Sequence, residues 1–179
     1  MKTLAHHTLR CASLVATLAL VPAGLMAQMD STPASSASSN SALSRSDRTF
    51  FHKAAEGGMK EVSVSQAVMD HLTNSQVRDF AQTMIKDHTA ANAALAVLAG
   101  NKGVTLPGAD DSIADKWSKK DNGADKDYIE EMVSDHKGVV KLFEKAAKSD
   151  DADISAFAQK MLPTLQHHLS MAEDLQKSM

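Results

Sequence analysis

The sequence predicts an all-α fold, a four-helix bundle made of two antiparallel helix hairpins that are joined by a long crossover. Ala, Leu, Met and Lys are frequent, and aromatic residues make up only 4% of the 179 residues, which favours helices over a sheet. Apolar residues recur in the 4-3 alternation of packed helices. One phrase also occurs twice, as Met84-Ile85-Lys86-Asp87-His88 and as Met132-Val133-Ser134-Asp135-His136, which indicates paired helices.

Residues 1–27 have the pattern of a secretory signal peptide. Lys2 and Arg10 give a basic start, an apolar run covers 14–21, and small residues follow up to Ala27. The apolar run is shorter than the roughly 20 residues that a membrane-spanning helix needs. We therefore expect an exported protein that works in the periplasm or cell envelope.

The remainder of the chain divides into a spacer and one domain. Residues 28–45 are mostly Ser, Ala, Thr and Pro with almost no charge, which predicts a disordered spacer. Residues 46–179 have an ordinary length for a single bundle domain. The only cysteine, Cys11, lies in the leader, so the mature chain has neither a disulfide nor a thiolate metal site.

Charge and motifs exclude several classes of function. The formal net charge is −3, and removal of the leader takes away two basic residues, Lys2 and Arg10. The acidic mature chain has no basic patch for nucleic acid. It also has no Gly-rich phosphate loop, no nucleophilic triad order and no HExxH motif. We expect no nucleic-acid partner and no transmembrane span in the mature chain. The identity of a protein or small-ligand partner and the oligomeric state stay open.

The first hairpin is expected to fill the first half of the domain. The first helix should start at Ser46 or Asp47, both good N-caps, and end near Leu72. The second should be capped by Asn74 or Ser75 and end at about residue 99, before Gly100. Since only a few residues separate these helices, they should be antiparallel neighbours.

The second hairpin follows a linker over 101–123, in which the spacing of Ile113 and Trp117 predicts one short helix. Its helices should cover about 124–148 and, after a cap at Ser149 or Asp150, the stretch toward Lys177, where Pro163 is expected to interrupt the helix. At about 3.3 Å per residue the linker spans roughly 70 Å, whereas a helix of this length is only about 36 Å long. The linker can therefore cross the whole bundle, which is the ferritin-like arrangement.

At this level of detail the chain resembles a known family, the bacterial envelope family called domain of unknown function 4142. The resemblance covers about residues 47–176 and is specific only in combination. It rests on these segments: Phe51, Ala54-Ala55, Gly58, Glu61-Val62, Val77–Ala81, Met84–His88, Asn92, Leu95, Tyr128, Met132–His136, Phe143, Phe157-Ala158, Leu162–Leu165 and His168. The stretch Asp125–Tyr128 departs from the more hydrophobic entry that such proteins usually have. The resemblance implies a ferritin-like fold and an envelope location, and it implies no activity.

Four polar residues fall on the apolar seams near the middle of their helices. They are Glu61, His88, His136 and His168. Because mid-height is the same level whichever way a helix runs, the four side chains can converge on a divalent transition metal such as Zn²⁺, Mn²⁺, Fe²⁺ or copper. Asp87 and Asp135 are neighbours in sequence of two of the histidines and are expected to orient these ligands from behind.

Two other interpretations of these residues stay open. The four can be buried polar groups that hydrogen-bond to one another, to Ser65 or to water, and so fix the helix register without any ligand. Alternatively, Pro163 shifts the phase of the last helix and leaves His168 at the surface. A di-iron centre is disfavoured because it needs Glu-x-x-His on two helices, and Ile85, Val133 and Leu165 stand three residues before the histidines.

The function expected from the sequence alone is therefore coarse. We predict an exported ferritin-like domain, more consistent with a non-enzymatic envelope or stress-related binding protein than with an enzyme. The competing hypothesis is a metal-binding or redox protein that uses the Glu and His residues at mid-bundle. No catalytic residues and no organic cofactor can be assigned from the motifs.

Overall fold

The computed structural model describes residues 42–120 and 122–179 of the chain. The predicted signal peptide, 1–27, lies outside the described residues, as does all of the predicted spacer except 42–45. The described part is helical and contains no strand. In chain order its elements are α1 (Arg45–Val68), the 3₁₀ turn η1 (Met69–His71), α2 (Ser75–Asn101), α3 (Asp111–Trp117), α4 (Ala124–Ala146) and α5 (Ala152–Ser178).

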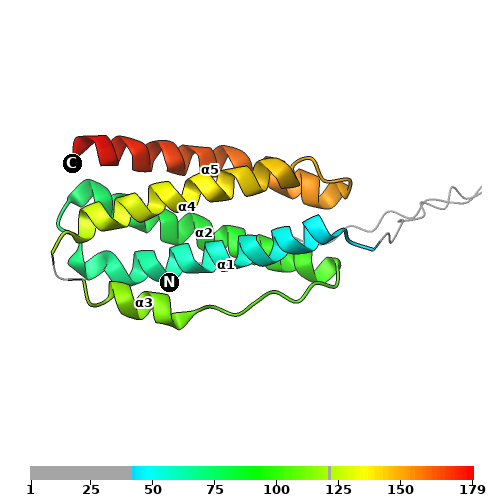
Figure 1. Ribbon diagram of the computed structural model, residues 1–179, viewed down its shortest axis with the longest axis horizontal. Helices are drawn as coiled ribbons and strands as arrows, with labels where there is room; N and C mark the ends of the chain where they lie inside the picture. Colours follow the sequence, from blue (N-terminus) through cyan, green and yellow to red (C-terminus); the bar gives the residue numbers. More distant parts are fainter. Residues whose placement is uncertain (1–41, 121) are drawn as a thin grey trace, which may run out of the picture. The chain divides into compact units, whose positions relative to one another are not determined.

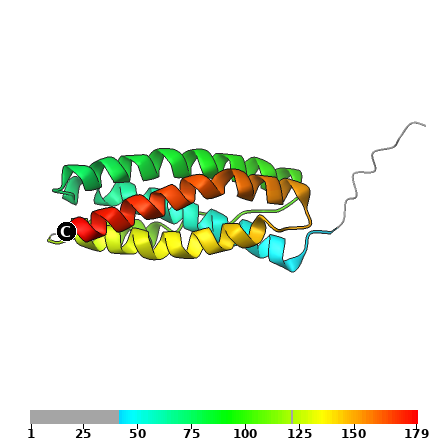
Figure 2. The same ribbon diagram turned by 90° about the horizontal axis from the view of Figure 1, so that it is seen from above.

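The four long helices form a bundle of two antiparallel hairpins (Figure 1). Helix α1 packs against α2, and α4 packs against α5; the hairpins meet where α1 contacts α4 and α2 contacts α5. After α2 the chain returns along the bundle, and α3 packs on α1 before α4 begins, so that α2 and α4 run in the same direction (Figures 1 and 2). The predicted all-α bundle with one long crossover is confirmed.

Helix α1 begins slightly earlier than the sequence predicted. Its N-cap is Ser44, whose hydroxyl accepts a hydrogen bond from the backbone N–H of Asp47 and donates one to the Asp47 carboxylate. Such a reciprocal box satisfies one of the free N–H groups of the first turn. Asp47, which was expected to be a cap itself, is therefore the third residue of the helix.

The acidic entry to α4 has a structural role. The Asp125 carboxylate accepts hydrogen bonds from the backbone N–H groups of Thr73 and Asn74 and from the Thr73 hydroxyl. It thereby satisfies backbone donors in the loop between α1 and α2 and joins the two hairpins at this end. In the stretch 125–128, which departs from the expected hydrophobic pattern, Asp125 thus connects α4 to the loop before α2 through hydrogen bonds rather than through apolar packing.

Pro163 does not interrupt α5, which continues from Ala152 to Ser178. The proline is exposed, so its ring points away from the bundle. Proline has no N–H to donate to the carbonyl four residues earlier, and that carbonyl lies on the solvent side of the helix. Burial follows the same seam before and after it, from Ala158 to Leu165 and His168. The phase shift considered for His168 therefore does not occur.

The apolar core consists of two clusters, one toward each end of the bundle. One is centred on Phe80, Trp117 and Tyr128, and the other on Phe50 and Phe143. Each long helix contributes apolar residues to both clusters. Between these contributions each helix places one buried polar residue, and these residues are Glu61, His88, His136 and His168.

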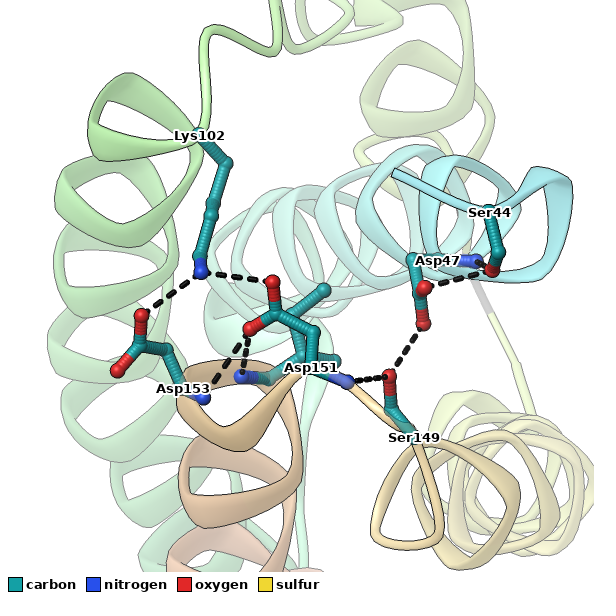
Figure 3. A network of polar contacts seen from close by, with 7 residues as sticks. Ser44, Asp47, Lys102, Ser149, Asp151 and Asp153 are labelled. Carbon is teal, nitrogen blue, oxygen red and sulfur yellow. Dashed lines mark hydrogen bonds and ion pairs between the residues drawn. The ribbon is translucent and has the colours of Figure 1, made fainter. Parts of the chain in front are cut away.

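A polar network closes the end of the bundle at which α1 begins (Figure 3). The Ser149 hydroxyl donates to the Asp47 carboxylate at 2.7 Å, which connects α1 to the turn between α4 and α5. The Lys102 ammonium lies 2.7 Å from both Asp151 and Asp153, which connects the end of α2 to the same turn. The N-cap of α5 is Asp151, one or two residues after the predicted cap.

In the part of the chain that the structure describes, no helix combines the length and the apolar character that crossing a bilayer requires.

Candidate metal centre

The four residues singled out from the sequence meet in the middle of the bundle. Glu61, His88, His136 and His168 come from α1, α2, α4 and α5, and their exposed fractions are 1%, 4%, 0% and 1%. Helical geometry explains the meeting, because each residue occupies a seam position near mid-height of its helix. The structure thus brings all four together, as the seams predicted.

The carboxylate of Glu61 lies behind two of the imidazoles. Its Oε2 is 2.9 Å from Nδ1 of His88, and its Oε1 is 3.3 Å from Nδ1 of His136. Neither contact is well aligned as a hydrogen bond, so both buried oxygens keep acceptor capacity. In metal sites, a carboxylate commonly contacts the ring nitrogen of a ligating histidine that does not bind the metal. Glu61 has this position relative to His88 and His136.

The other two ring contacts also use acceptors. Nδ1 of His136 donates to the backbone carbonyl of Met132, one turn earlier on α4, at 2.9 Å. Nε2 of His168 lies 3.1 Å from the Asp87 carboxylate on α2. Since a carbonyl or a carboxylate can only accept, these contacts assign the ring proton to Nδ1 of His136 and Nε2 of His168. Asp87 thus holds a histidine of the opposite helix rather than its own neighbour His88.

Each histidine keeps one further nitrogen. Nε2 of His88, Nε2 of His136 and Nδ1 of His168 are fully buried and have no hydrogen-bond partner among the described residues. The three rings lie close, with centroids 5.3 to 5.5 Å apart. One ligand nitrogen from each ring falls within 4.8 Å of the others. Two nitrogens of a tetrahedral ion with bonds of about 2.1 Å are roughly 3.4 Å apart, so small side-chain rotations close the site.

Electrostatics keep two of these rings neutral. Burial lowers the pKa of His168 to about 4, against the raising effect of Asp87. Burial also lowers the pKa of His136, against the charge of Glu61. For Glu61, burial raises the pKa, but the contact with His88 opposes it and the net shift of the pKa is downward, so Glu61 is ionised. Neutral imidazole is the form that binds a metal.

Asp135 is not joined to a histidine. Its carboxylate lies 2.8 Å from the Lys60 ammonium, which also pairs with Glu131 at 2.5 Å. Burial raises the pKa of Asp135 although Lys60 opposes this. The role expected for Asp135, to orient a ligand, therefore has no contact to support it, since its carboxylate faces Lys60 on α1. Sequence inspection missed Lys60, because a lysine beside a seam position usually reaches solvent.

Ser65, which was considered as a partner for the polar cluster, is engaged elsewhere. Its hydroxyl lies 2.7 Å from the hydroxyl of Tyr128, and both side chains are fully buried. Burial raises the pKa of the Tyr128 hydroxyl far above its usual value. The histidine nitrogens therefore receive no hydrogen bond from Ser65.

A cavity of 320 Å³ reaches the cluster from the side of α2 and α5. Glu61, His88 and His168 line its inner end, and apolar side chains such as Leu95 and Phe157 form much of its wall. Its lining also includes Gly58, where a Cβ would lie 2.1 Å from the side-chain oxygen of Asn92. The missing side chain of Gly58 thus allows α2 to place an amide against α1.

Comparisons with known proteins agree with this fold. A model of the family described as domain of unknown function (DUF4142) matches residues 32–175. The crystal structure of a DUF305 fragment from Deinococcus radiodurans is similar, with a TM-score of 0.65 and 10% sequence identity over 76% of this chain and 98% of that chain. At that identity the likeness concerns the fold alone. No curated protein matches the sequence.

Proposed function

Because this chain belongs to the family described as domain of unknown function DUF4142, and that description assigns no activity, we propose a function from its site. The protein binds one divalent transition-metal ion at mid-bundle through His88, His136 and His168. Glu61 and Asp87 orient these ligands. We assign it metal binding and no reaction.

One observation carries this proposal. Three helices each bury a ring nitrogen that has no hydrogen-bond partner among the described residues, and the three rings that carry these nitrogens lie together, with centroids 5.3 to 5.5 Å apart. Leaving a buried acceptor unpaired costs about 1–3 kcal/mol for each group. A metal ion satisfies all three at once, because a neutral imidazole nitrogen is a good ligand.

The alternative is a polar cluster that only fixes the helix register. In that case the buried groups should satisfy one another or use a neighbouring hydroxyl or a water molecule. Instead, His136 and His168 each donate a hydrogen bond from one ring nitrogen, and the second ring nitrogen has no partner among the described residues. The Ser65 hydroxyl is hydrogen-bonded to Tyr128. One metal ion accounts for all three free nitrogens together, whereas the register interpretation requires buried water molecules as their hydrogen-bond donors.

The ligand types indicate the class of ion. Imidazole nitrogens suit Zn²⁺, Cu²⁺, Fe²⁺ and Ni²⁺, whereas Mg²⁺ and Ca²⁺ prefer oxygen ligands. A di-iron centre of the ferritin kind uses a carboxylate from each of four helices. The cluster contains one carboxylate on a seam, Glu61, so a single ion fits this chain better.

We also propose that the ion is bound outside the cytoplasm. The support is the leader pattern over 1–27, with Lys2, Arg10 and an apolar run. The N-terminus of the protein purified from an envelope fraction tests this. A start near residue 28 is expected, and a protein that keeps residues 1–27 and stays in the cytosol contradicts it.

Metal binding is tested with chelator-stripped protein and added Zn²⁺ or Co²⁺. We expect one ion per chain by elemental analysis. We also expect stabilisation by about 2.7 kcal/mol when free metal is a hundredfold above its dissociation constant. His88→Gln, His136→Gln and His168→Gln should each weaken binding by more than the roughly 10–100-fold that loss of an orienting group costs.

The matched control is His167→Gln, because His167 is next to His168 on α5 but exposed. This variant should bind as the parent does. Substoichiometric metal and an unfolding curve that metal does not move would remove the proposed function. Equal losses in the His167 and His168 variants would locate binding outside the cluster and have the same consequence.

A further inference from the structure

The cavity between α2 and α5 gives the proposed metal site an opening on one side. Figure 2 shows these two helices running side by side along the bundle. The cavity has a volume of 320 Å³, and two of the three histidines, His88 and His168, line it together with Glu61. A second cavity, of 610 Å³, lies beside α1 and α4 and includes Glu61 in its lining but none of the three histidines. Of these two cavities, the one between α2 and α5 is therefore the one that borders the histidines.

From this arrangement we infer that the bound metal keeps one open coordination position and binds there a small carboxylate whose short apolar body fills the cavity. The inference rests on the proposed metal site and names its exogenous ligand. Three protein nitrogens leave a tetrahedral ion with one free position, which in zinc proteins belongs to water or an exogenous ligand. Glu61 lies behind Nδ1 of His88 and His136 and is not one of the three clustered ligands.

The cavity wall determines the body of the ligand. Ala91, Leu95, Phe157 and Met161 form an apolar surface that extends away from the histidines. A volume of 320 Å³ is at the lower end of the range for small-molecule sites. A chain of a few methylenes is therefore accommodated, and each buried methylene contributes about 0.8 kcal/mol, or roughly a fourfold gain in affinity.

Charge determines the head of the ligand. A divalent ion balances the carboxylates of Glu61 and Asp87, which face the rings from behind. Lys160 also lines the cavity, is exposed, and has no ion-pair partner within the described part of the chain. One positive charge is then left over at the cavity, and a monoanion neutralises it. A carboxylate supplies both the charge and an oxygen that binds the ion.

The test uses the full chain loaded with Co²⁺, whose visible absorption reports changes in its ligands. Acetate, butyrate and hexanoate are added in turn, with azide as a small anion that has no apolar body. We expect saturable spectral changes with all of them. Affinity should rise by up to about fourfold for each added methylene that enters the cavity, so that hexanoate binds at least tenfold more tightly than acetate.

Two substitutions fill the cavity without touching a ligand. Ala91→Phe places a ring inside it, and Ala94→Phe does so from an exposed position that tolerates a large side chain more easily. Both should keep the metal affinity and weaken hexanoate at least tenfold. Ala93→Phe, on the same helix but outside the lining, is the control and should bind hexanoate normally.

The outcomes separate this inference from the proposed function. If Co²⁺ binds stoichiometrically and no anion changes its spectrum, the open position is disproved while metal binding stands. Equal affinities for acetate and hexanoate, or hexanoate binding that survives both Ala91→Phe and Ala94→Phe, would show that the cavity is not the ligand site. If Co²⁺ itself does not bind, both the metal site and its exogenous ligand are rejected.

Discussion

Glu61 touches two imidazoles at once, because its two carboxylate oxygens face Nδ1 of His88 and Nδ1 of His136. A single residue of α1 thereby lies against histidines on both α2 and α4. Asp87 accepts a hydrogen bond from Nε2 of His168, across the interface between α2 and α5. At the scale of residues, the cluster thus consists of three rings and the two carboxylates that contact them.

This geometry predicts the effect of Glu61→Gln, a substitution that keeps the shape of the side chain and removes its charge. We expect the variant to bind one ion, with an affinity lowered by about 10–100-fold, because an outer carboxylate orients its ligands and strengthens them. Competition against a chelator of known affinity measures this. Glu56→Gln, an exposed position on α1, is the control. Unchanged affinity in Glu61→Gln would contradict the orienting role.

At the residue scale the sequence predicted positions better than roles. The apolar seams placed Glu61 and the three histidines inside, since inward direction depends only on helical period. The partner of each side chain depends on its rotamer and on the neighbouring helix, which periodicity does not contain. Asp87 and Asp135 looked equivalent in the repeated phrase, yet one contacts His168 and the other contacts Lys60.

At the scale of elements, the helix ends are held by polar side chains that act across helices. Asp47 completes the cap of α1 and also accepts a hydrogen bond from Ser149, in the turn before α5. The sequence identified helix types and approximate limits, because caps and apolar periods are local signals. It could not show that one aspartate serves two elements, and it overstated the effect of Pro163, whose exposed side leaves the helix continuous.

The network in Figure 3 predicts that Asp47→Ala lowers the free energy of unfolding by about 1–3 kcal/mol, since it removes the carboxylate that accepts hydrogen bonds from the Ser44 and Ser149 hydroxyls. Denaturant unfolding measures this. Asp150→Ala, at an exposed position in the same turn, should change stability by less than about 0.5 kcal/mol. Metal affinity should stay unchanged, because Asp47 lies about 20 Å along α1 from Glu61. Equal effects of the two substitutions would refute this role of Asp47.

At the scale of the whole molecule, the site lies between two apolar clusters and takes one residue from each long helix. The loop lengths predicted the two hairpins and the long crossover, and with them the common level of the four seams. No single helix holds two of the clustered ligands. Assembly of the three histidines therefore requires the complete bundle, so that the proposed metal binding would be coupled to folding.

Burial of His136 and His168 also makes the stability of the metal-free bundle depend on pH. The pKa of His168 is about 4 in the folded chain, against 6.5 for an ordinary histidine, so between these values the unfolded chain binds a proton that the folded chain excludes. The free energy of unfolding should therefore be fully maintained above pH 6.5. It should fall as the pH drops toward 4, by up to about 1.4 kcal/mol per pH unit for this histidine. Burial lowers the pKa of His136 in the same direction.

Denaturant unfolding in the presence of chelator, from pH 7 to pH 4, measures this slope. His168→Gln should flatten it, because glutamine does not titrate, whereas His167→Gln at the exposed neighbouring position should leave it unchanged. Saturating Zn²⁺ should steepen the loss of stability in the parent protein, since protons then compete with a bound ion for the same nitrogens. Identical slopes for the parent and His168→Gln would mean that folding does not lower the pKa of His168, so that the folded bundle binds a second proton at Nδ1 as easily as the unfolded chain does. A protonated Nδ1 is not available to an ion.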